Sequence, residues 1–225
     1  MTHRTRIKIC GLTRVDDVQA AVAAGADAIG FVFYADSPRY IDPVQAARLI
    51  AAMPPFVTTV GLFVNATPEQ VVAVVAVAPV SLLQFHGDET PAQCADAASR
   101  ANRPYVRAVR VRHDAIGADL LEYEQRHRAG SSLFTGLLLD AFVDGYGGGG
   151  KVFDWSLIPE ELAPRVVLSG GLSVQNATDA VRRVRPYAVD VSSGVESAKG
   201  IKDAHAMRAF VDAVHRADLV AISSQ

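Results

Sequence analysis

The sequence predicts an α/β fold, a single (β/α)8 TIM barrel that spans residues 1–225. Short runs rich in Val, Ile, Leu and Phe begin about every 26 residues, which is the length of one βα unit. Eight such units fill the chain and leave no linker for a second domain. The runs are continuously apolar, as at Leu137, Leu138 and Leu139, which is typical of parallel strands buried on both faces.

The eight expected strands each precede a polar or glycine-containing loop, and they cover residues 6–11, 28–33, 58–64, 81–86, 105–111, 133–140, 166–170 and 188–193. Helix periodicity between them is clearest at residues 15–24, 43–52, 174–184 and 203–215. One helix start is marked by Thr67 as N-cap, Pro68 at the first helical position and Gln70, which completes a capping box. The helix at residues 71–77 is apolar nearly all round, so a homodimer contact and tight packing within a monomer both stay open.

Charge and composition exclude several classes of partner. With 22 Lys and Arg against 24 Asp and Glu, the net charge of −2 gives no electrostatic reason to bind nucleic acid or an anionic membrane surface. The longest apolar stretch, residues 71–80, is about half of the roughly 20 residues needed to cross a bilayer, and it contains Pro79. Two cysteines cannot build a disulfide framework, and the first 30 residues lack a signal-peptide core. We therefore expect a cytoplasmic protein that recognises a small molecule.

Barrel enzymes carry their chemistry where strands end, and two such side chains here have acid or base character. Cys10 ends the first strand; it is either a small buried hydrophobe or, as a thiolate, a general base, since a thiol pKa of about 8.5 needs only a modest downward shift. Asp140 ends the sixth strand. It either caps the next segment or faces the barrel mouth, the opening at the C-terminal ends of the strands, and desolvation there favours a protonated general acid. Base and acid would then face each other. Cys94, inside a helix pattern, is interpreted as structural.

Further polar residues are expected around the mouth. Arg39, in the loop after the second strand, is either solvated or a planar fork that clamps a substrate carboxylate. His86, after the fourth strand, is interpreted as a hydrogen-bonded rim residue rather than a base. Lys8 shares the inward face with Cys10 by the two-residue strand period, and a lysine inside a barrel needs a partner, which we predict to be Asp190 on the adjacent eighth strand.

A phosphate site is predicted after the last two strands, where barrels often bind this group through glycine N–H donors and a short helix N-terminus. Its candidate residues are Gly170, Gly171, Ser192, Ser193 and Gly194. Two ordinary glycine turns are the alternative. The glycine-rich residues 145–151 fit two phosphate-loop patterns at once, but Val152 supplies no hydroxyl for magnesium, so we interpret them as a flexible loop over the site.

Taken together, these motifs resemble the phosphoribosylanthranilate isomerases of tryptophan biosynthesis. The matching segments run in family order over nearly the whole chain: Lys8-Ile9-Cys10-Gly11-Leu12-Thr13, Ser37-Pro38-Arg39-Tyr40, Gly61-Leu62-Phe63-Val64, Gln84-Phe85-His86-Gly87, Leu138-Leu139-Asp140, Gly147-Gly148 with Gly150-Lys151 and Phe153-Asp154-Trp155, Ser169-Gly170-Gly171-Leu172, Asp190-Val191-Ser192-Ser193-Gly194-Val195-Glu196, and Lys202-Asp203.

The resemblance implies a cofactor-free, metal-free Amadori rearrangement of N-(5-phosphoribosyl)anthranilate, an aminoaldose, to 1-(2-carboxyphenylamino)-1-deoxyribulose 5-phosphate. Carried over by position, Asp140 is the general acid that protonates the furanose ring oxygen, and Cys10 is the general base that removes the C2′ proton. Arg39 is expected to bind the anthranilate carboxylate. Two positions depart from the family pattern: Gly149 replaces a usual Thr, and Lys199 precedes Gly200 where the family has Pro.

Three alternatives remain. One is another phosphosugar barrel isomerase of the histidine-pathway type, which resembles a two-aspartate design, whereas Cys10 ends the first strand here. The second is a nucleotide-binding module that uses residues 145–151, against which the missing Ser or Thr argues. The third is a non-catalytic barrel that binds a phosphate ligand.

Overall fold

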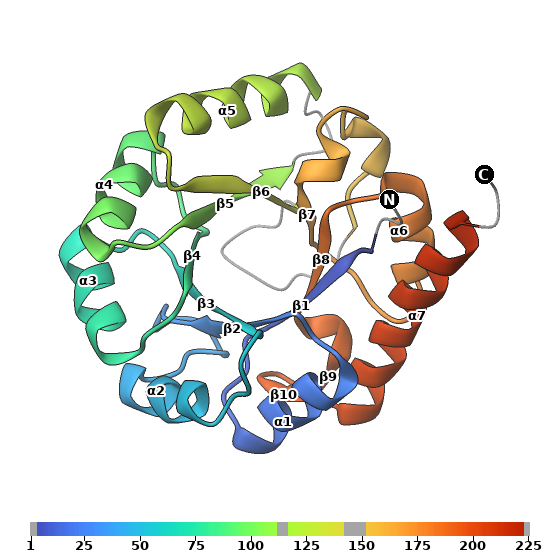
Figure 1. The fold of residues 1–225 in the computed structure, drawn as a ribbon, viewed down its shortest axis with the longest axis horizontal. Coiled ribbons are helices and arrows are strands. Elements are labelled where there is room, and N and C mark those ends of the chain that lie inside the picture. Colours follow the sequence, from blue (N-terminus) through green and yellow to red (C-terminus); the bar gives the residue numbers. More distant parts are fainter. Residues whose placement is uncertain (1–3, 112–116, 142–151, 223–225) are drawn as a thin grey trace.

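The structure, a computed structural model, describes residues 4–111, 117–141 and 152–222. Eight parallel strands close into a barrel in chain order, from β1 to β8, and helices surround it (Figure 1). Each strand pairs with its sequence neighbours, and β1 pairs with β8 to close the ring. The predicted (β/α)8 barrel is confirmed.

The strands begin and end close to the predicted positions: β1 Arg6–Cys10, β2 Ala28–Val32, β3 Thr58–Phe63, β4 Leu82–Phe85, β5 Tyr105–Val111, β6 Phe134–Ala141, β7 Val167–Leu168 and β8 Ala188–Val191. The α-helices of the described residues are α1 Val15–Ala24, α2 Pro43–Ala51, α3 Pro68–Val77, α4 Pro91–Ala101, α5 Gly117–Gly130, α6 Ala177–Val184 and α7 Ala204–Ile222. Three short 3₁₀ helices complete the described part: η1 Trp155–Leu157, η2 Ala163–Arg165 and η3 Ser193–Val195.

Two features differ from the prediction. Strand β7 is only two residues long, because Gly170 and Gly171 adopt left-handed backbone angles that end the ladder. An antiparallel hairpin that periodicity did not predict, β9 Glu196–Ala198 with β10 Ile201–Lys202, follows η3. The short β7 precedes Gly170 and Gly171, which are predicted to bind phosphate. The hairpin contains Glu196 and Lys202, which belong to the last two motifs of the sequence.

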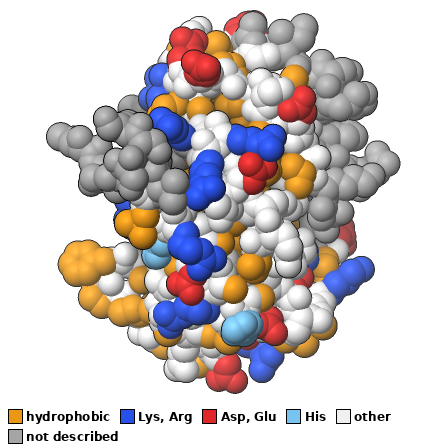
Figure 2. Space-filling model, turned by 90° about the vertical axis from the view of Figure 1, so that its right-hand side faces the viewer, with side chains coloured by type: hydrophobic (Ala, Val, Ile, Leu, Met, Phe, Trp, Pro, Cys, Tyr) orange, Lys and Arg blue, Asp and Glu red, His pale blue; other side chains and the backbone are white. Residues whose placement is uncertain are grey.

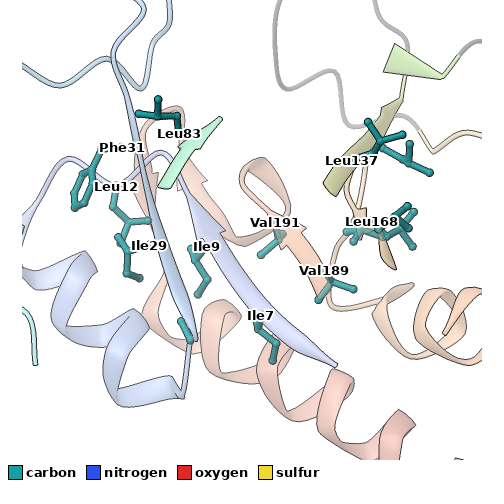
Figure 3. Close-up of a cluster of buried hydrophobic side chains, with 14 of the residues drawn as sticks. Ile7, Ile9, Leu12, Ile29, Phe31, Leu83, Leu137, Leu168, Val189 and Val191 are labelled. Carbon is teal, nitrogen blue, oxygen red and sulfur yellow. The ribbon is translucent and has the colours of Figure 1, made fainter. Parts of the chain in front are cut away.

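The outer face of the barrel wall is apolar, whereas the inner face carries polar side chains among apolar ones such as Val32 and Leu62. In β1, Ile7 and Ile9 extend toward the surrounding helices, as Figure 3 shows, and both are fully buried. Lys8 and Cys10 alternate with them and therefore point inward. Lys8 is the register partner of Asp190 in β8, so the two side chains start from neighbouring points inside the ring.

Helix α3 shows the predicted capping box, with Thr67 and Gln70 each accepting from the other's backbone N–H. Its apolar surface mostly packs on neighbouring elements: Val71 and Val75 are buried, and Val72 and Val74 lie against the core. Only Val77, at 46% exposure, is a large exposed hydrophobic residue of this helix. Packing within one chain therefore explains most of this helix.

No helix in the described ranges is both long and apolar enough to cross a membrane. On the face shown in Figure 2, Lys and Arg side chains are interspersed with Asp and Glu side chains.

The buried His127 of α5 predicts a loss of stability in acid. Its Nδ1 lies 3.2 Å from the Tyr105 hydroxyl oxygen, its Nε2 has no partner among the described residues, and burial followed by the charge of Arg107 lowers its pKa to about 4. The unfolded chain binds a proton near pH 6.5 and the folded chain does not, so stability falls as pH drops from about 6.5 to 4, by roughly 3 kcal/mol at most. Urea unfolding measures the free energy of unfolding at each pH. For His127→Gln this free energy should fall less steeply between about pH 6.5 and 4 than for the wild type, and an equal fall would contradict this assignment.

Candidate active site

Cys10 is the C-terminal residue of β1, and it lies beside an ion pair. Lys8 Nζ donates to Asp190 Oδ1 at 2.8 Å, as predicted for this pair, and both side chains are buried. Ser169 Oγ donates to the other oxygen, Asp190 Oδ2, at 3.2 Å. Gly30 of β2 makes room for the group, because a Cβ built there would come within 2.7 Å of Cys10 Sγ and 3.1 Å of Lys8 Cε. The thiol therefore occupies a tight, largely dry position next to a neutralised lysine.

The pKa of Cys10 is shifted upward, opposite to the modest downward shift that would make a thiolate abundant near neutral pH. Burial of the thiol, which is 4% exposed, raises its pKa, and the charge of Lys8 lowers it only in part. The physical reason is that Asp190 already neutralises the Lys8 ammonium and itself raises the thiol pKa. Burial by itself lowers the pKa of Lys8, but the charges of Asp190 and Cys10 more than reverse this and keep the ammonium protonated.

Asp140 and His86 form a hydrogen-bonded pair on the opposite part of the wall. Asp140 Oδ2 lies 3.0 Å from His86 Nε2, and Asp140 Oδ1 accepts the N–H of Ala141 at 2.9 Å. The Nδ1 of His86 lies 2.9 Å from the amide nitrogen of Gln84, which is fully buried in β4. His86 is thus a hydrogen-bonded rim residue, as predicted. Since β1 and β6 are three strands apart in the ring of eight, Cys10 and Asp140 approach the mouth from different sides.

The Arg39 side chain is buried, and its guanidinium group is already paired with a carboxylate of the chain. It is 9% exposed, and it donates to both oxygens of Glu196, through Nε at 2.7 Å and Nη2 at 2.8 Å. Its Nη1 has no partner among the described residues. Lys202 Nζ donates to the same carboxylate at 2.8 Å and to the Ser192 carbonyl at 3.0 Å. Burial alone would raise the pKa of Glu196, but the hydrogen bonds from Arg39 and Lys202 bring it below its ordinary value.

The β9–β10 hairpin brings these charges to the loop of Arg39. Gly200 in its turn has φ +78°, and a Cβ there would lie 2.8 Å from the carbonyl oxygen of Pro38. Gly11 contacts the Arg39 side chain directly. It has φ +79°, and the Arg39 side chain packs over it. The glycine of the Lys199-Gly200 pair is therefore required by the backbone, whereas Lys199 is exposed.

The candidate phosphate residues form two loops in contact at the ends of β7 and β8. Gly170 and Gly171 have φ of +80° and +65°. Gly194 packs so closely on the carbonyl of Leu172 that no side chain fits there. Ser192 Oγ donates to the carbonyl of Cys10 at 3.0 Å, and Ser193 and Gly194 belong to η3, the short helix after β8. This arrangement brings the five predicted residues to the same end of the barrel.

Gly170 also supports Asp140, which gives a testable prediction. A Cβ on Gly170 would lie 2.8 Å from Asp140 Oδ1 and closer still to the Ala141 nitrogen, at a positive φ that disfavours alanine. We expect Gly170→Ala to lower kcat by about tenfold or more, since such strain amounts to roughly 1–3 kcal/mol. Gly130→Ala, at a position with no neighbouring atom within 4 Å, is the control. Equal kcat values for the two purified variants would contradict this role.

The sequence missed three of these residues as functional candidates: Gln84, Glu196 and Lys202. All three stand in the quoted motifs, but only their contacts show what they do. Of the residues singled out earlier, 145–151 lie outside the described ranges, and Gly149 with them. Cys94 is fully buried in α4, and burial raises its pKa to about 12, which fits its structural interpretation.

Comparison with known proteins identifies the family of this chain. A family model for N-(5′-phosphoribosyl)anthranilate (PRA) isomerase matches residues 7–213. The chain is 69% identical to the N-(5′-phosphoribosyl)anthranilate isomerase of Herminiimonas arsenicoxydans, over 97% of this chain and 96% of that protein. It is 60% identical to that of Methylibium petroleiphilum, over 99% of both chains.

Solved structures give the same result. The phosphoribosyl anthranilate isomerase of Thermotoga maritima superposes with a TM-score of 0.82 at 40% identity, over 94% of this chain and 99% of that one. Another, in complex with reduced 1-(o-carboxyphenylamino)-1-deoxyribulose 5-phosphate, superposes with a TM-score of 0.79 at 38% identity, over the same shares. By sequence and by fold, the chain belongs to the family of N-(5′-phosphoribosyl)anthranilate isomerases, enzymes of tryptophan biosynthesis.

Proposed function

We propose that the isomerase reaction of this chain uses Asp140 as general acid and Cys10 as general base, without a metal or cofactor. The observation that carries this proposal is the placement of one titratable group on each side of the mouth, at the ends of β6 and β1. A positioned acid or base accelerates its proton transfer by roughly 10²- to 10⁴-fold. The two groups act in sequence on one substrate.

In the first step, protonated Asp140 donates to the furanose ring oxygen. The C1′–O bond breaks, the anilino nitrogen lone pair forms a C=N bond, and the open-chain product is a protonated Schiff base with a free hydroxyl. Asp140 is left as a carboxylate. The N–H of Ala141 at 2.9 Å and His86 at 3.0 Å stabilise this charge.

In the second step, the Cys10 thiolate removes the C2′ proton. The electron pair of the C–H bond forms the C1′=C2′ double bond, and the C=N electrons return to nitrogen to give an enolamine, which tautomerises to the ketone. Lys8, which lowers the thiol pKa through its charge and a hydrogen bond, favours the thiolate. A raised thiol pKa makes the thiolate scarcer but more basic toward carbon.

Two further contacts would hold the substrate. The Nη1 edge of Arg39 is available to the anthranilate carboxylate while Glu196 fixes the opposite edge. The substrate phosphate would be bound by Gly170, Gly171, Ser192, Ser193 and Gly194, whose loops present backbone N–H donors. Holding both ends orients C1′ and C2′ between the acid and the base.

The activity is tested with purified protein and N-(5-phosphoribosyl)anthranilate, with the aminoketose product followed by NMR. We expect turnover after removal of metal by a chelator. Absence of turnover would contradict the proposal, and activity that is lost with the chelator and restored by metal would contradict its metal-free form. Because both cysteines are free thiols in a biosynthetic enzyme, we place the reaction in the cytoplasm.

For the assembly, we propose a homodimer through the end of the barrel where the strands begin. A cavity of about 460 Å³ opens there, lined by residues that include Thr58, Leu82 and Tyr187. Phe56 is also one of the lining residues, yet its side chain is fully exposed, and its φ is +69°. A phenylalanine held in an unfavourable conformation in water suits insertion into the same cavity of a second copy. One Thermotoga maritima relative is described as a dimeric phosphoribosylanthranilate isomerase.

Sedimentation tests this assembly. We expect the chain to sediment at twice its own mass and Phe56→Glu at its own mass, since a buried carboxylate disfavours the interface. Val77→Glu, on the exposed part of α3, should remain dimeric. A monomeric wild type, or a Phe56→Glu dimer with a monomeric Val77→Glu, would contradict this interface.

A further inference from the structure

Gln84 of β4 is a buried polar side chain to which the mechanism above gives no role. It is fully buried, its amide nitrogen lies 2.9 Å from His86 Nδ1, and its Oε1 has no hydrogen-bond partner among the described residues. A buried amide with an unsatisfied oxygen is unfavourable, by roughly 1–3 kcal/mol. An apolar residue would avoid this penalty, so the contact with His86 is the feature that Gln84 specifically provides.

This contact determines the tautomer of the imidazole. An amide nitrogen can only donate, so His86 Nδ1 must accept. Neutral His86 then carries its proton on Nε2 and donates it to Asp140 Oδ2 at 3.0 Å. The chain of hydrogen bonds runs in one direction, from Gln84 through His86 to Asp140.

The direction of the His86–Asp140 hydrogen bond decides whether a protonated Asp140 can donate its proton to the substrate. If Nε2 lacked a proton, it would accept the Asp140 O–H and hold the proton against the barrel wall. With Nε2 protonated, the imidazole offers Asp140 no acceptor. We propose that Gln84 is a positioning residue that fixes the Nε2–H tautomer of His86 and so directs the Asp140 proton to the substrate. This inference rests on the role proposed for Asp140.

A purely structural role for Gln84 is already filled by other residues. Arg107 donates to the carbonyls of Phe85 and Gly87, each at 2.9 Å, and Glu89 accepts the N–H of Gly87 at 2.9 Å. These bonds hold the backbone after β4 without Gln84. Loss of its amide should therefore alter the protonation of His86 more than the position of the loop.

Two substitutions separate the roles. Gln84→Met keeps the volume and removes the donor, and we expect kcat to fall about tenfold with KM unchanged. Gln84→Glu keeps the shape, and its ionised carboxylate can only accept, so it requires a proton on His86 Nδ1; at a pH where this side chain is ionised we expect kcat to fall further, by about a hundredfold. Gln19→Glu on the exposed face of α1 controls for added charge, and thermal unfolding confirms that each variant is folded.

The tautomer itself is read by ¹⁵N NMR of the histidines without substrate, with His86 assigned by a His86→Gln variant. We expect protonated Nε2 and unprotonated Nδ1 in the wild type, and protonated Nδ1 in Gln84→Glu. A wild-type Nδ1–H tautomer, or a Gln84→Glu kcat at or above that of Gln84→Met, would overturn the inference. Full activity of Asp140→Asn with the expected tautomer would instead refute the role of Asp140 and leave the tautomer assignment standing.

Discussion

Asp140→Asn is expected to lower kcat by roughly 10²- to 10⁴-fold while KM changes little. The amide keeps the size of the side chain and can still accept the N–H of Ala141, but it has no acidic proton for the ring oxygen. Ring opening then depends on water as the proton donor. The loss should appear in kcat because the carboxyl acts on the bound substrate.

Steady-state kinetics of purified variants measure this effect. Asp96→Asn, an exposed aspartate of α4 that pairs only with surface arginine, is the matched control and should keep wild-type kcat. Full activity of Asp140→Asn would refute the acid role while leaving the family assignment intact.

Cys10→Ser is expected to cause a loss of similar size, again roughly 10²- to 10⁴-fold in kcat. A serine hydroxyl ionises far less readily than a thiol, so almost no base is present at neutral pH. In the wild type, burial raises the pKa of Cys10, and the base must be ionised to act. The rate should therefore rise as pH increases above neutrality, toward the raised thiol pKa.

The pH dependence of kcat in the wild type and in Cys10→Ser tests this assignment together with the loss of rate. Cys94→Ala removes the other thiol, which is fully buried on α4. This variant should have the kcat of the wild type and the same pH dependence. A Cys10→Ser enzyme with wild-type kcat, or a wild-type rate that falls as the thiol ionises, would contradict the base role.

Repeating patterns in the sequence predict the parts of this fold that follow from regular strands and helices and from the order in which the strands pair. Strand order follows from the repeat of βα units, and the Lys8–Asp190 ion pair follows from the two-residue strand period and the pairing of β1 with β8. The capping box at Thr67 is read from three neighbouring residues.

Other features depend on contacts between distant residues, which periodicity does not show. Arg39 meets Glu196 only because a short hairpin turns back at Gly200 against the Pro38 carbonyl. The pKa of Cys10 is raised because burial outweighs the charge of Lys8, and the charge of Asp190 adds to the rise. The role of Gln84 depends on which amide atom faces His86.

The most direct test of the acid–base pair is rescue of a tryptophan auxotroph that lacks this isomerase. The account predicts that the wild-type chain restores growth without tryptophan, and that Cys10→Ser and Asp140→Asn, expressed at the same level, do not. Failure of the wild-type chain, or growth of either variant at the wild-type rate, would contradict it.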